Sequence, residues 1–283
     1  QLEDPKQAKG LVKRDVIRVV TPGTNLDAQA LDESRNNYLM CIICMEDRYG
    51  LSVADISTGE YLVTELDGEK KLLDEINKFS PSEIICNEAF MMSGISLDSI
   101  KDRLNITVSS LEPYYFDDEL SKRLLLEHFK AADMMGLGLA DYSIGSVAAG
   151  ALLQYLYETQ KNDLNNISVI HPYSTGKYMI IDSSTRRNLE LVETLREKQK
   201  RGSLLWVLDK TKTAMGARRL RQMLEQPLVV GGDIVTRQQA VAYLKDEVIT
   251  REELREYLNP VYDLERLIGR ISTRSAGPRD LIA

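Results

Sequence analysis

The segment YLMCIICMEDRYGLSVADISTGEYLVTEL, Tyr38–Leu66, decides the fold of this chain. It opens with a continuous apolar run, Tyr38–Met45, continues with alternating residues, Leu51–Ser57, and closes with β-forming residues, Tyr61–Leu66. Each of the two intervals between these runs contains or borders a glycine, which favours a tight turn. We therefore predict three antiparallel strands that form a meander.

After this meander the hydrophobic period changes. Helices and strands are predicted in alternation: a helix carrying Leu72, Leu73, Ile76 and Phe79, a strand at Glu83–Cys86, a helix at Leu97–Leu104 and a strand at Ile106–Ser109. Three meandering strands followed by helix, strand, helix and strand are the order of an RNase H-like mixed sheet. We predict an α/β domain of that kind.

Beyond Pro113 the pattern is almost entirely helical. Asp117 or Asp118 can cap one helix and Ser143 another, and Tyr178–Asp182 is a possible strand. Further helices are predicted at Asn188–Lys200, Met215–Glu225, Ile234–Lys245, Arg251–Tyr257 and Val261–Ile271, with breaks at Pro227, Gly231-Gly232 and Pro260. The fold class is thus α/β plus all-α, in two folded units.

Composition limits the classes of function. The 283 residues carry 36 Lys and Arg against 43 Asp and Glu, a net charge of -7, which argues against a whole-surface grip on DNA. The longest apolar run has eight residues, too short for the roughly 20 of a membrane helix, and no leader opens the chain. Three cysteines, an odd number, indicate a reducing compartment. We expect a cytoplasmic protein without a membrane partner.

Few residues of the sequence suit a catalytic or metal-binding site. An RNase H-like nuclease needs clustered carboxylates on its central strand, yet Tyr38–Met45 has none, and Asp55 reads as a turn-forming acid. Cys41 and Cys44 are three apart on a strand and should point to opposite faces, and Cys86, His128 and His171 are distant in sequence. Phosphate-loop, dinucleotide and serine-nucleophile motifs are absent. We predict no catalytic, cofactor-binding or metal-binding residue.

One basic stretch contrasts with the acidic whole. Between residues 196 and 221 only Glu197 and Asp209 are acidic, and the local net charge is +7. These residues could contact phosphate, or they could form a solvated helix face that pairs with acids elsewhere. The candidate phosphate-contacting residues are Arg196, Lys198, Lys200, Arg201, Lys210, Lys212, Arg218, Arg219 and Arg221.

Several blocks of sequence, in order, carry a resemblance. They are VTPGT at 20–24, DISTGEY at 55–61, DSSTRRNLEL at 182–191, GSLLWVLDKTKTAMGARRLRQML at 202–224, DLERLIGRI at 263–271 and SAGPRDL at 275–281. Together they resemble the middle of the MutS family of DNA mismatch-recognition ATPases. One departure is Met223, where the family often carries Trp.

The resemblance implies a division of the chain. Residues 1–24 would be the tail of an N-terminal mismatch-binding domain, 25–160 an RNase H-like connector with linking helices, and 161–283 the first part of a helical core or lever domain. A core cut at that point should expose apolar positions on its last helix, among them Leu264, Leu267, Ile268 and Ile271.

The resemblance also implies a function. This region would be a non-catalytic connector that couples mismatch binding to the ATPase and offers a platform for a MutL-type partner. Mismatched double-stranded DNA, ATP with Mg, and homodimer formation would belong to the full-length protein, and no cofactor to this region. Two alternatives remain open: an RNase H-like metal-dependent nuclease, and a stand-alone MutS-like interaction module.

Overall fold

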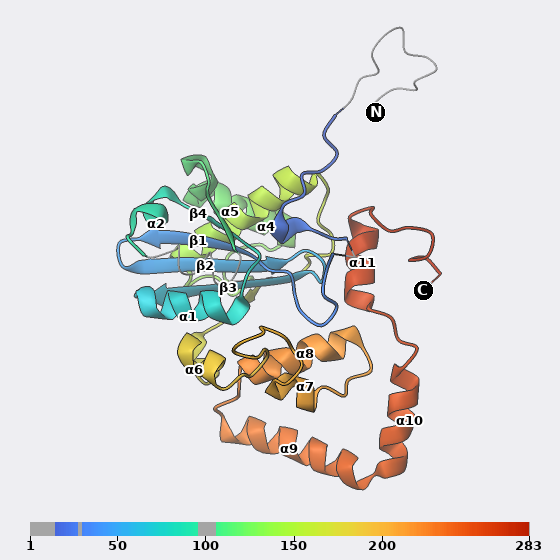
Figure 1. Cartoon of the computed structure of the whole chain (residues 1–283). Coiled ribbons are helices and arrows are strands. Elements are labelled where there is room, and N and C mark those ends of the chain that lie inside the picture. The colour runs from blue at the N-terminus through green and yellow to red at the C-terminus, as the bar shows by residue number, and fades with distance from the viewer. Residues whose placement is uncertain (1–14, 28–29, 96–105, 283) are drawn as a thin grey trace, which may run out of the picture.

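A computed structural model describes residues 15–27, 30–95 and 106–282. Figure 1 shows a sheet with helices on both faces and, below it, a helical region that extends away and returns to one end of the sheet. The predicted α/β-plus-helical fold class is therefore confirmed. Among the described helices, none is long and apolar enough to cross a membrane.

The three-stranded meander is confirmed. Strands β1 (Leu39–Met45), β2 (Arg48–Asp55) and β3 (Glu60–Asp67) pair antiparallel, with Ile42 opposite Leu51 and Val53 opposite Leu62. The first six residues of β1 are buried, as expected for an apolar strand covered on both faces.

Further strands extend the sheet on both sides. Strand β4 (Glu83–Cys86) lies parallel to β1, and β5 (Thr107–Ser110) parallel to β4. The order β5-β4-β1-β2-β3-β6 is that of an RNase H-like mixed sheet with one added strand. That strand, β6 (His171–Pro172), pairs parallel with β3. No strand was predicted at His171–Pro172, because Leu62, the partner of His171, is so distant in sequence that no local pattern reveals the pairing.

Two hydrophobic clusters lie on opposite faces of the sheet. Helices α4 (Asp118–Phe129) and α5 (Ser143–Gln160) belong to the cluster on one face. Helices α1 (Glu69–Phe79) and α2 (Glu88–Met92) cover the other. Helix α2 was not predicted, and the predicted helix at Leu97–Leu104 lies outside the described residues.

Helix α5 approaches its neighbours closely because small residues line it. A side chain at Gly50 of β2 would collide with the backbone of Ile144, and one at Gly150 would collide with Ser121 of α4. The Tyr61 hydroxyl of β3 donates to the carbonyl of Ala149 at 2.6 Å, which satisfies a buried polar group within this tight packing.

Two predicted helix caps have different outcomes. The carboxylate of Asp117 accepts from the Leu120 amide at 2.7 Å and caps α4, as predicted. Ser143 is not a cap, because α5 already begins there and Tyr142 precedes it without a side-chain cap. Instead Glu65 of β3 accepts from the amides of Ile144 and Gly145 at 2.6 and 2.9 Å. A carboxylate remote in sequence thus takes the role assigned to a local serine.

The second half is helical, as predicted. Its helices are α6 (Ser183–Asn188), α7 (Leu204–Leu208), α8 (Ala214–Glu225), α9 (Gly231–Asp246), α10 (Val248–Leu258) and α11 (Leu264–Ser272). Short 3-10 turns occur at Pro22–Thr24, Pro113–Phe116 and Thr175–Lys177. No residue of α9 or α10 is buried within the described chain, and Figure 1 shows these two helices as the outer edge of the molecule.

Three predictions in this half are wrong. The helix predicted at Asn188–Lys200 is absent, because Glu190 and Lys198 have φ values of 47° and 50°, which interrupt a right-handed helix. The strand predicted at Tyr178–Asp182 is reduced to one bridge between Tyr178 and Leu228. The predicted break at Gly231-Gly232 is instead the first turn of α9, where glycine is tolerated.

Candidate functional site

The helical region meets one end of the sheet through a buried arginine, Arg218 of α8, which is only 5% exposed. Its guanidinium donates to both carboxylate oxygens of Asp263 at 2.7 Å and to Glu265 at 2.6 Å. It also donates to the carbonyl of Glu33, ahead of the sheet, at 3.0 Å. Burial alone would lower the pKa of Arg218, but these two carboxylates raise it above the ordinary value, so the side chain stays charged.

A second buried arginine adds to this contact. Arg266 of α11 donates to the carbonyl of Arg35 at 2.6 Å. Burial lowers the pKa of Arg266 from the ordinary arginine value, while the negative charge of Asp55 acts to raise it. On the same helix, a side chain at Gly269 would collide with the carbonyl of Ser57 in the β2–β3 turn. We call the contacts of Arg218, Arg266 and Gly269 the joint.

Asp55 serves the β2–β3 turn, as predicted. Its carboxylate accepts from the amide and hydroxyl of Ser57 at 2.8 and 2.6 Å, from the Asn36 side chain at 2.9 Å and from the Asn37 amide at 3.1 Å. These four donors hold the acid in place beside the joint. In the described part of the chain, no group of three or more His, Cys, Asp or Glu residues could hold a metal ion.

The cysteines have the predicted arrangement. Cys41 and Cys44 lie in the hydrophobic clusters on opposite faces of the sheet, and Cys86 lies in the same cluster as Cys44. All three are buried and free of disulfide bonds. Burial raises the pKa of both Cys41 and Cys44, which keeps them protonated and unreactive at neutral pH.

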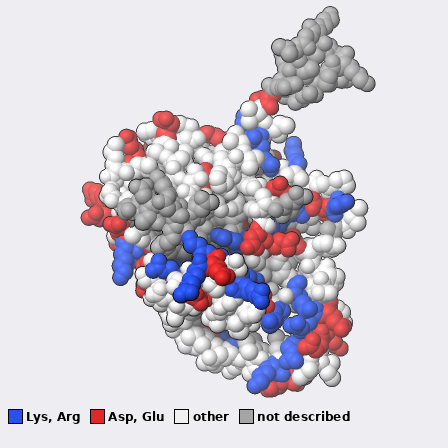
Figure 2. All heavy atoms as spheres, viewed as in Figure 1, with Lys and Arg blue, Asp and Glu red and all other residues white. Residues whose placement is uncertain are grey.

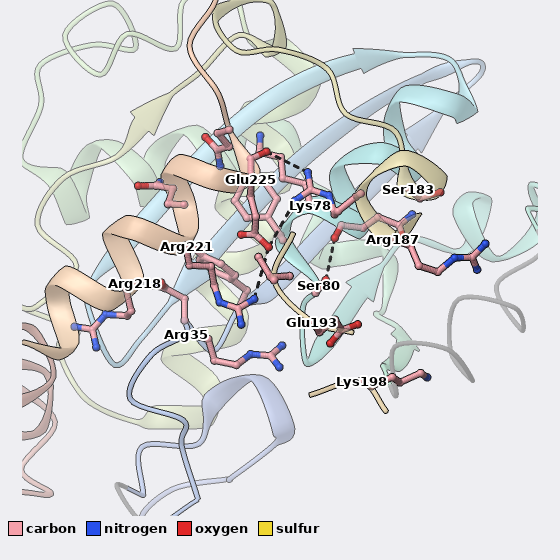
Figure 3. A pocket seen from close by; sticks show the side chains of 18 of the residues that line it. Arg35, Lys78, Ser80, Ser183, Arg187, Glu193, Lys198, Arg218, Arg221 and Glu225 are labelled. Atoms are coloured by element: carbon pink, nitrogen blue, oxygen red, sulfur yellow. Dashed lines mark hydrogen bonds and ion pairs between the residues drawn. The ribbon is translucent and has the colours of Figure 1, made fainter. Parts of the chain in front are cut away.

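A pocket of about 230 Å³ opens next to the joint, between α1, α6, α8 and the segment before β1. Figure 3 shows its lining side chains arriving from these separate elements. We call it the basic pocket. Its basic lining residues are Arg35, Lys78, Arg186, Arg187, Lys198, Arg218 and Arg221, and its acidic ones are Glu193 and Glu225.

Glu225 of α8 is the acid at the centre of these cations. Its carboxylate lies 3.6 Å from Arg186 Nη1 and 3.7 Å from Arg221 Nη1, which are ion pairs longer than hydrogen bonds. Burial raises the pKa of Glu225, against the opposing effect of Arg221, Arg186, Arg35 and Lys78. Glu225 is thus a single carboxylate, with a pKa raised by burial, that lies among four cations.

The nine candidate basic residues do not form one patch. Arg218 is buried in the joint, Lys200 pairs with Asp209 at 2.5 Å, and Arg219 donates to Gln222. Two others, Lys198 and Arg221, line the basic pocket and are not part of the joint. The other four are exposed: Arg196, Arg201, Lys210 and Lys212.

Four basic residues of the pocket were not among the candidates predicted from the sequence. Arg35, Lys78 and Arg186-Arg187 belong to three segments far apart in the chain. Only the adjacent pair Arg186-Arg187 offered a local signal, and nothing in it indicated proximity to α8. Figure 2 shows Lys and Arg gathered near the middle of one face, interspersed with acids, where the sheet meets the helices.

Comparisons with known proteins agree on one family. Family models described as MutS domain II and MutS domain III match residues 37–168 and 184–283. All 283 residues align at 62% identity with the DNA mismatch repair protein MutS of Lachnoclostridium phytofermentans, covering 30% of that protein. The MutS proteins of Ruminiclostridium cellulolyticum and Alkaliphilus oremlandii are 49% and 45% identical, with 32% and 33% covered. The chain therefore spans about a third of the length of these relatives.

Proposed function

The chain belongs to the MutS family, with the family's domains II and III, and we propose that it acts as a non-catalytic connector within a DNA mismatch repair protein. Its role would be to transmit the state of a mismatch-binding site to an ATPase located in another part of the full-length protein. The joint carries this proposal, because it is where α8 and α11, in the region matched to domain III, contact the segment before β1 and the β2–β3 turn.

The joint suits transmission for a physical reason. Arg218 and Arg266 donate to main-chain carbonyls of residues 33 and 35, and Arg218 is also paired with Asp263 and Glu265, so a shift of α8 or α11 must move these segments or break buried contacts of a charged group. Breaking a buried ion pair by loss of one partner costs about 3–5 kcal/mol. Such a contact favours discrete arrangements, which coupling between two sites requires.

Partners and cofactors form part of the same proposal. Domain II would offer a surface to a MutL-type protein, and mismatched double-stranded DNA would be bound by the full-length protein acting as a homodimer. ATP and Mg would bind in its ATPase, and the protein would work in the cytoplasm. The names of the relatives, which describe DNA mismatch repair proteins, support the part of this proposal that concerns mismatched DNA.

The nuclease alternative has no observation in its favour. Strand β1 has no carboxylate, and the Asp55 carboxylate is occupied by four donors from neighbouring residues. A stand-alone interaction module would use the same joint, so the presence of Walker motifs in the gene that encodes this chain decides between that alternative and the connector.

The coupling role is tested in the full-length protein by Arg218→Gln, with the exposed neighbour Arg219→Gln as the matched control. We expect mismatch affinity and basal ATPase activity to change less than about threefold in both variants. Stimulation of nucleotide exchange by a mismatch should fall at least about fivefold in Arg218→Gln alone, the lower range of allosteric coupling. Unchanged stimulation would overturn the proposal.

The platform role is tested by calorimetry of the 283-residue chain with a MutL-type protein. A mismatched duplex and a matched duplex are titrated in parallel at near-physiological salt. We expect saturable binding of the MutL-type protein and no preference for the mismatch. Mismatch-selective DNA binding by this chain would place recognition here and contradict the connector role.

A further inference from the structure

The basic pocket brings together cations that the joint does not use. Arg218 is neutralised by Asp263 and Glu265, and Lys78 pairs with Glu75 at 2.8 Å. Arginines from three other segments also line the pocket, which contains only two acids, Glu193 and Glu225. These arginines are Arg35, Arg186, Arg187 and Arg221. Clustered like charges repel each other, so this arrangement favours an added anion.

Two of these arginines carry donors without an acceptor. Nε and Nη1 of Arg186 and Nε of Arg221 are buried and have no hydrogen-bond partner among the described residues. Glu225 lies 3.6 and 3.7 Å from their Nη1 atoms, too far to accept a good hydrogen bond. A buried donor left unsatisfied costs about 1–3 kcal/mol, and more when it is charged. Because these N–H groups are closed to solvent as they stand, Arg186 and Arg221 would have to turn toward the pocket to offer them to an anion.

The geometry points to a binding site for a phosphate group in the basic pocket, held by Arg186 and Arg221 and closed by Arg35, Arg187 and Lys198. Planar guanidinium groups match phosphate oxygens with paired donors, while a lysine supplies a point charge. The volume of about 230 Å³ is many times the roughly 10–15 Å³ that a single water needs, which leaves room for the five heavy atoms of a phosphate group.

Occupation of this site would have a structural consequence. A phosphate group bound there would bridge α6, α8 and the segment that contains Arg35, and the last two of these elements also meet in the joint. The anion would therefore stiffen the attachment of the helical region to the sheet. This inference does not depend on the coupling role, since a phosphate site can exist whether or not the joint transmits a signal.

The test is a calorimetric titration of inorganic phosphate into the 283-residue chain, at ionic strength held constant with chloride. We expect saturable binding that weakens at least about tenfold in Arg221→Gln, since one hydrogen bond to a charged group is worth about 1.5–3 kcal/mol. Arg187→Gln, an exposed position on α6 that does not threaten the fold, should weaken binding about threefold. Arg219→Gln on α8 is the control with the same change in charge.

A second arm identifies the source of the phosphate group. A matched duplex is added before the phosphate: competition indicates that a DNA backbone phosphate occupies the site, and unaffected binding indicates a free phosphate compound. Either result supports phosphate chemistry at the basic pocket. No saturable binding, or an equal loss in Arg219→Gln and Arg221→Gln, would overturn it.

Discussion

The sheet and the outer helices of this chain are stabilised by different means. Helix α5 lies almost wholly buried against the sheet, with Leu152 at 0% exposure, whereas α9 and α10 have no buried residue among those described and Leu258 is 44% exposed. The sheet domain thus has its own hydrophobic core. The helical region has few buried apolar side chains among its described residues and contacts the segment before β1 through the joint, so we expect that its attachment can be altered without loss of the sheet.

The largest expected effect is a loss of stability in the sheet domain. Leu152→Ala removes a fully buried side chain between α5 and the sheet, and the free energy of unfolding should fall by about 3–5 kcal/mol. Urea unfolding followed by far-ultraviolet circular dichroism measures the change. A loss below about 1 kcal/mol would mean that the α5 face is not the tightly packed core described here.

Breaking the joint should have the next largest effect, confined to the helical region. Arg218→Ala leaves Asp263 and Glu265 without their common partner, which should destabilise the attachment of α8 and α11 by about 3 kcal/mol. Trp206, the only tryptophan, lies in α7 of this region and reports its unfolding by fluorescence. The control Arg219→Ala should shift the transition by less than about 0.5 kcal/mol.

The pH dependence of the joint follows from Asp263. Burial acts to raise its pKa, but hydrogen bonds and charge from Arg218 outweigh burial, and the pKa lies below the ordinary value. An acid with a lowered folded pKa contributes stability above its unfolded pKa, about 3.9, and loses it as pH falls through the folded pKa.

We therefore expect the stability difference between the native chain and Arg218→Ala to be constant from pH 7 to about 5 and to shrink below about pH 4. The raised pKa of Glu225 acts in the opposite direction, with stability lost as pH rises, but it affects both proteins and cancels in the difference. Trp206 fluorescence during urea unfolding at each pH provides the measurement. A difference that grows toward low pH would contradict this assignment.

The smallest effect is expected on the outer helices. Leu258→Ala in α10 removes a side chain that is 44% exposed and belongs to a helix without buried residues, so stability should change by less than about 0.5 kcal/mol. The same urea experiment serves as the measurement. A loss similar to that of Leu152→Ala would show that α10 packs against a surface, and the contrast between the two regions would then disappear.

The sequence predicted the sheet well because its signals are local. The apolar run of β1, the alternation of β2 and the turn acid Asp55 each depend on neighbouring residues, and the structure contains them as expected. Helices α8 to α11 were also recognised from periodicity and from the breaks at Pro227 and Pro260. The exposure expected at Leu264, Ile268 and Ile271 is present, while Leu267 is partly buried.

Contacts between distant segments could not be predicted. Strand β6 exists only because β3 offers an edge, and Glu65 replaces Ser143 as the cap of α5 from another element. The joint is likewise made of contacts between segments that are distant in sequence. Arg218 was a candidate phosphate contact within a basic run, and only the fold brings Asp263 and Glu265 to it.

Hydrogen exchange of the 283-residue chain, compared between the native sequence and Arg218→Ala, tests most directly whether the joint holds the helical region to the sheet. Amides of α8 and α11 should lose protection in the variant, while those of β1, β2 and β3 keep theirs. Unchanged protection of α8 and α11, or an equal loss in the three strands, would contradict the account.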